Sequence, residues 1–107
     1  MVSINTAVED RVRKAIRVLS QKQPVAAVYV FGSQVNGQPD KWSDIDIAVF
    51  IEGMETVGLQ QRARLSATVQ KEAGDELELH YFSKDMLDHP TPASFAKFVI
   101  THGIRIE

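Results

Sequence analysis

Residues 31–50, FGSQVNGQPDKWSDIDIAVF, hold the pattern that decides both the fold and the candidate site of this chain. Gly32 and Ser33 close an apolar, β-branched run at 25–31, which is typical of a strand covered on both faces. Ten residues then separate Ser33 from Asp44, and they are mostly polar or turn-forming, as expected of a loop. A strand-like run resumes at Asp44. The pattern predicts two strands joined by a loop that can fold back over the second strand.

Asp44 and Asp46 are expected on one face of that second strand, because alternate side chains of a strand point the same way. At about 7 Å apart along the backbone, their carboxylates can converge on two hard cations held about 4 Å apart. Magnesium fits, since it takes few protein oxygens and completes its shell with water and phosphate; manganese is the alternative. A third carboxylate would complete the site. Glu78, within a strand predicted at 76–82, is the candidate, and Glu76 is the fallback.

Gly32 and Ser33 are candidates for binding phosphate. Backbone N–H groups at this position, together with the Ser33 hydroxyl, can cradle phosphate oxygens, and a glycine permits a close approach. Ser43, just before the aspartates, is a further candidate nucleotide contact, with a turn or cap role as the alternative. The ligand implied is a polyphosphate. The structural alternatives are an ordinary strand-ending turn at Gly32 and an exposed strand face at the aspartates.

The remaining segments predict the fold class. Apolar residues at helical spacing predict a leading helix with Thr6 and Glu9 as its capping box. A second helix is expected over about 54–73, and a last helix is expected to open at Thr91. The closing residues 104–106 either add a short strand or simply pack. The result is an α/β fold with a small mixed sheet of about three strands covered by helices, in which a helix links the second strand to the third and favours parallel pairing.

Composition limits the possible functions. The 107 residues are expected to form one domain, 1–107. Twelve Lys and Arg against 14 Asp and Glu give a net charge of -2, which disfavours nucleic acid as the main ligand. The absence of cysteine removes thiolate chemistry and makes a cytoplasmic location the default expectation. Neither a membrane-spanning run nor a signal-peptide core is expected from the sequence.

These motifs resemble the DNA polymerase beta-like nucleotidyltransferase superfamily, in particular its minimal nucleotidyltransferase branch. The resemblance covers most of the chain and implies a fold like the palm of polymerase beta. It implies that Gly32 and Ser33 hold the terminal phosphates of a nucleotide. It also implies that Asp44 and Asp46 bind two magnesium ions, while Glu78 helps bind the catalytic metal and activates the attacking hydroxyl.

The same resemblance implies transfer of AMP from ATP to a hydroxyl acceptor, with release of pyrophosphate. Because the sequence is too short for the acceptor-binding domains of larger relatives, the acceptor is expected to bind an exposed site or to come from a partner, and a partner protein is the more economical expectation. Minimal nucleotidyltransferases are often paired with small helical HEPN proteins in toxin–antitoxin modules, so the resemblance implies an antitoxin that adenylylates its toxin, in a homo- or hetero-oligomer.

A second hypothesis stays open: a binding module with the nucleotidyltransferase fold that neutralises a partner by contact alone. Two departures from the family pattern favour it. Gln34 stands near the position where many relatives carry an arginine, and Glu78 stands where the third carboxylate is usually an aspartate. A nucleic-acid polymerase is disfavoured, because the chain lacks a basic patch and the extra domains of polymerases.

Overall fold

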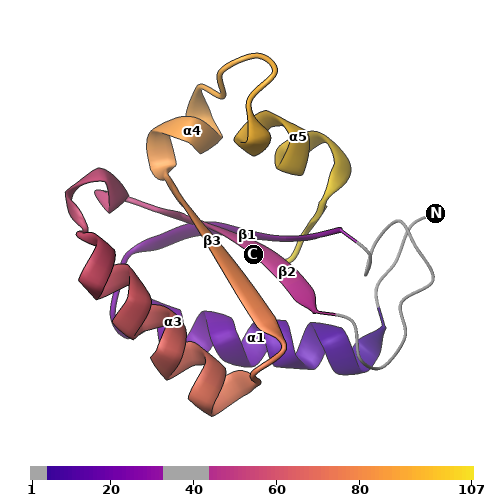
Figure 1. Cartoon of the computed structure of the whole chain (residues 1–107). Coiled ribbons are helices and arrows are strands. Elements are labelled where there is room, and N and C mark those ends of the chain that lie inside the picture. The colour runs from indigo at the N-terminus through magenta and orange to yellow at the C-terminus, as the bar shows by residue number, and fades with distance from the viewer. Residues whose placement is uncertain (1–4, 33–43) are drawn as a thin grey trace.

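The computed structural model describes residues 5–32 and 44–107, in which helices cover a central sheet (Figure 1). The elements follow one another as α1 (Thr6–Ser20), β1 (Val25–Phe31), β2 (Ile45–Ile51), η1 (Met54–Thr56), α3 (Leu59–Ala73), β3 (Leu77–Ser83), α4 (Lys84–Asp88), α5 (Phe95–His102) and β4 (Ile104–Arg105). This is the mixed α/β architecture expected from the sequence. Within the described ranges, every helix is too short or too polar to cross a membrane.

The sheet has the strand order β3-β2-β1-β4. β1 runs antiparallel to β2 and to β4, whereas β2 and β3, which α3 connects, are parallel as expected. The described part of the sheet has four strands rather than about three. The additional strand forms because Ile104 and Arg105 pair with Val30 and Tyr29 at the free edge of β1. The closing segment thus covers a strand edge that would otherwise be open.

Alternation along the strands gives the sheet two faces, each covered by a different pair of helices (Figure 1). One face packs against α1 and α3, and its buried strand residues are Val28, Val30, Ile45, Ile47, Val49, Ile51 and Leu77. The other face carries α4 and α5, and its buried strand residues are Ala27, Tyr29, Phe31, Ala48 and Phe50. The second group shares its face with the even-numbered residues of β2, so the candidate site lies on the side of α4 and α5.

The expected capping box at the start of α1 is wrong by one residue. Asn5 is the N-cap, and its side-chain oxygen accepts a hydrogen bond of 2.7 Å from the backbone N–H of Ala7. Glu9, instead of reaching back to Thr6, forms an ion pair with Arg13 at 3.1 Å. Asparagine caps a helix at least as well as threonine does, which explains the shift.

The helix expected over 54–73 is two elements, η1 and α3, separated at Gly58. The Arg62 side chain stabilises this break by donating hydrogen bonds to the carbonyl oxygens of Val57, at 3.1 Å, and Met54, at 3.2 Å. The last helix also begins later than expected. Its N-cap is Ser94, three residues after Thr91, and the Ser94 hydroxyl oxygen accepts from the Lys97 N–H at 3.1 Å.

Candidate functional site

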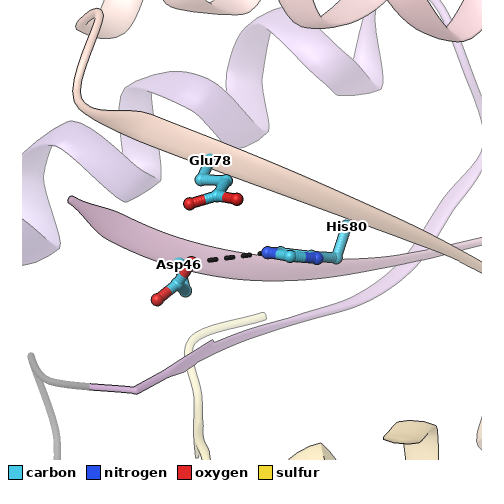
Figure 2. A group of neighbouring side chains, drawn as sticks. All are labelled: Asp46, Glu78 and His80. Atoms are coloured by element: carbon cyan, nitrogen blue, oxygen red, sulfur yellow. Dashed lines mark hydrogen bonds and ion pairs between the residues drawn. The ribbon is translucent and has the colours of Figure 1, made fainter.

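Asp46, Glu78 and His80 form a compact group of ligand atoms that all lie within 4.8 Å of one another (Figure 2). Asp46 lies near the start of β2, and the other two lie on β3. The parallel register places Asp46 beside Glu78 and Ala48 beside His80, so the three side chains project from the same face of the sheet. The predicted pairing of strand two with strand three is therefore what brings the two carboxylates together.

The sequence alone does not predict His80 as a ligand, because a lone histidine on a strand is more often packed or solvated. In the structure its Nε2 atom lies 3.4 Å from Oδ1 of Asp46, with both side chains partly buried. Its ring meets the ring of Phe31 edge-on, with centroids 5.1 Å apart. The signal available in the sequence was its spacing of two from Glu78, which puts both side chains on one face.

Gly32 lies directly against the Asp46 carboxylate, and its backbone has a positive φ of 83° that only glycine adopts readily. A Cβ atom added here would lie 2.7 Å from Oδ2 of Asp46, closer than any ordinary contact. The neighbouring residue, Phe31, is the register partner of Asp46 across the antiparallel pair. A side chain at this position would therefore occupy the space next to Oδ2 of Asp46, which glycine leaves unfilled.

The other predicted site residues are placed as follows. Asp44 is exposed and lies one residue before β2, so it is outside the strand that the sequence predicts for it. It does not belong to the group of described residues whose ligand atoms lie within 4.8 Å. Ser33, Ser43 and Gln34 lie outside the described residues, and their predicted roles stay predictions.

Glu76, the fallback for the third carboxylate, has a structural partner. Its Oε1 atom lies 2.7 Å from a guanidinium nitrogen of Arg11, which ties the start of β3 to α1. Its backbone oxygen accepts a hydrogen bond of 2.8 Å from the N–H of Ile45 at the start of β2. Glu78, by contrast, is exposed and lies inside the ligand group. Of the two glutamates, the geometry favours Glu78.

The donor set fits a divalent cation. Two carboxylates so close together repel each other when both are ionised, and a cation between them converts this repulsion into attraction. Carboxylate oxygens are the ligands that magnesium prefers, whereas an imidazole nitrogen is better suited to manganese and other transition metals. Asp46 and Glu78 therefore fit magnesium, and His80 adds a donor that fits manganese.

Comparison with known proteins agrees with this geometry. A family model described as a nucleotidyltransferase domain matches residues 12–102, from within α1 to the end of α5. Among solved structures, the crystal structure of a candidate nucleotidyltransferase from Sulfolobus solfataricus superposes with a TM-score of 0.53. It is 20% identical, and the match covers 80% of this chain and 81% of that one, so it shows a shared fold. No curated protein matches the chain.

Proposed function

Because the chain belongs to the nucleotidyltransferase domain family, whose model matches residues 12–102, we propose that it transfers AMP from ATP to a hydroxyl group on a partner protein. The observation that carries this proposal is the pairing of Asp46 with Glu78 across two parallel strands, with His80 beside them. Nucleotidyl transfer of some kind is what the family implies. The identities of the nucleotide and the acceptor are the finer parts of the proposal.

In the proposed reaction, the acceptor oxygen forms a bond to the α-phosphorus of ATP. The bond between that phosphorus and the oxygen bridging to the β-phosphorus breaks, and pyrophosphate leaves. The proton of the acceptor hydroxyl passes to a carboxylate or to water. The products are an AMP phosphoester of the acceptor and pyrophosphate, so that atoms and charge balance without a redox partner.

The proposed roles follow from position. Asp46 and Glu78 would hold divalent cations, with Asp44 adding a carboxylate from just outside the strand. Bound magnesium supplies charge neutralisation at the phosphates and lowers the pKa of the acceptor hydroxyl. Glu78 is exposed, so an acceptor can reach it, and in this proposal its carboxylate takes the hydroxyl proton. Gly32, which has no side chain against Asp46, would let phosphate oxygens approach that carboxylate.

The proposed partner is a small helical protein of the HEPN type, with this chain acting as the antitoxin that adenylylates it in the cytoplasm. The support for this partner is the resemblance of the Gly-Ser and Asp-x-Asp motifs to minimal nucleotidyltransferases. The alternative function is neutralisation of the partner by contact alone. In that case Asp44 and Asp46 would not be needed for neutralisation.

Label transfer tests the proposal. The protein, together with whatever protein co-purifies with it, is incubated with magnesium and ATP labelled at the α-phosphate. The expected result is label on the co-purified protein from the wild type and from Glu55→Gln, an exposed carboxylate in η1. No label is expected from a folded Asp44→Asn, Asp46→Asn variant. Unlabelled partner in all samples, or equal label with the double variant, contradicts the proposal.

A further inference from the structure

Helix α5 exposes two aromatic side chains, Phe95 and Phe98, and Phe95 packs against His80 of the candidate site. In the described part of the chain the exposed large hydrophobic side chains are Leu59, Phe95 and Phe98, and the two phenylalanines are 48% and 47% exposed. They are three residues apart on α5, so they lie on the same side of that helix. Leu59 lies at the start of α3, on the helix layer of the opposite sheet face.

The two rings continue a row that starts at the candidate site. His80, whose Nε2 atom is 3.4 Å from Asp46, meets Phe95 edge-on with centroids 5.8 Å apart and planes at 75°. Phe95 and Phe98 lie nearly parallel, with 14° between their planes and 6.3 Å between centroids. His102 follows at 4.7 Å from Phe98. The aromatic row, defined as these four rings, thus connects the carboxylates to an open surface.

We propose that the aromatic row binds the base of the nucleoside triphosphate by stacking, an inference that rests on the proposed function. A nucleobase is planar and has two π faces, and exposed aromatic rings bind such faces whatever the base. The half-exposed rings of Phe95 and Phe98 offer the surface for this contact, and His80 places that surface next to the metal-binding carboxylates.

The charge of α5 is compatible with a polyanionic ligand. The helix sequence, FAKFVITH, contains Lys97 and no acidic residue, so nothing on α5 repels the phosphates. Phenylalanine has no hydrogen-bonding group. Stacking on Phe95 and Phe98 therefore does not distinguish adenine from guanine, and any preference for ATP must come from hydrogen bonds made by other groups.

The test compares magnesium-ATP with magnesium-tripolyphosphate, which carries the phosphates without a base, by calorimetric titration. Phe98→Ala removes the more peripheral ring, and Phe95→Leu keeps an apolar side chain against Phe31 and Phe82. Phe98→Tyr keeps the ring, and Leu59→Ala is the control for loss of an exposed apolar side chain. Circular dichroism establishes that every variant is folded.

The aromatic row predicts that Phe98→Ala and Phe95→Leu weaken ATP binding by about 5- to 150-fold. Tripolyphosphate affinity stays within about twofold of wild type in these variants, and Phe98→Tyr and Leu59→Ala bind both ligands normally. The H2 and H8 protons of the adenine shift upfield in the proton NMR spectrum of the wild-type complex, as ring stacking requires.

Three results overturn the inference, and they are distinguishable. In the first, wild type binds tripolyphosphate and both phenylalanine variants bind ATP as tightly as wild type does. This result agrees with the proposed function but shows that the aromatic row does not bind the base. In the second, the two phenylalanine variants bind ATP normally but no longer bind the partner protein. This result shows that the rings contact a protein instead of a base. Wild type that binds neither ligand contradicts the proposed function, and the base site falls with it.

Discussion

Asp46 and Glu78 are register partners on the adjacent parallel strands β2 and β3. One register step in either strand would move one of the carboxylates to the opposite sheet face, into the packing with α1 and α3. The pairing is fixed by the apolar residues that flank the two carboxylates in the sequence, because Ile45, Ile47 and Leu77 are buried on that opposite face. The hydrophobic core thus determines where the carboxylates meet.

Glu78→Gln is expected to weaken magnesium binding and to abolish nucleotidyl transfer, because an amide supplies no negative charge to the metal or base to the acceptor. Glu76→Gln is the matched control. It breaks the partly exposed ion pair with Arg11, at a cost of about 0–1 kcal/mol in unfolding free energy, and leaves magnesium binding intact. Metal titrations and urea unfolding of both variants check this. The opposite pattern would make Glu76 the third carboxylate.

Gly32→Ala is expected to impair the site, whereas Gly53→Ala is not. Both glycines have positive φ, 83° and 77°, so alanine at either position costs about 1–2 kcal/mol of backbone strain. Only at Gly32 would the new Cβ collide with a carboxylate, at 2.7 Å from Asp46; nothing lies within 4 Å at Gly53. Urea unfolding and magnesium-ATP titration of the two variants separate the effects. If the two variants bound magnesium-ATP with equal affinity, Gly32 would not be part of the site.

His80→Phe is expected to change the metal preference. The substitution removes a nitrogen donor near Asp46 but keeps an aromatic ring against Phe31 and Phe95. Because imidazole nitrogen suits manganese better than magnesium, manganese affinity should fall more than magnesium affinity. His89→Phe, at an exposed position after α4, is the control. Parallel losses for both metals, or no loss, would show that His80 is not a ligand.

Tyr81 makes the unfolding free energy of the protein depend on pH in the alkaline range. Burial raises the pKa of its hydroxyl above the ordinary value of 10.0, and the hydrogen bond with Ser66 partly opposes that shift. The folded state therefore holds the Tyr81 proton more tightly than the unfolded state does. The contribution of this proton to the unfolding free energy is fully present below the unfolded-state pKa of Tyr81 and is lost as the pH rises through its folded-state pKa.

The Tyr81→Phe variant is expected to lose less unfolding free energy than wild type when the pH rises above 10.0. At neutral pH it should be less stable by about 1 kcal/mol, through loss of the 2.8 Å hydrogen bond with Ser66. Urea unfolding at several pH values compares the two proteins. Parallel stability curves would show that Tyr81 does not carry this dependence.

The sequence predicts the strands well, because the alternation of apolar residues in β2 and β3 specifies both faces of the sheet. The same alternation is enough to propose Glu78 as the partner of Asp46. It also puts His80 on the same face as Glu78, but it does not show that the imidazole lies against Asp46, since that contact depends on side-chain conformation as well as on strand register. The sequence also does not fix where α5 starts, because Thr91 and Ser94 can both cap a helix. In the structure Ala93 has a positive φ of 62°, which a right-handed helix that began at Thr91 could not contain.

We propose that Asp46 and its neighbours form a metal-dependent nucleotide site. Calorimetric titration of ATP, with and without magnesium, tests it most directly when the folded Asp44→Asn, Asp46→Asn variant is compared with wild type. The expected result is binding by wild type only when magnesium is present, and no binding by the variant. Magnesium-dependent binding that is equal in the two proteins, or failure of wild type to bind magnesium-ATP, would contradict the claim.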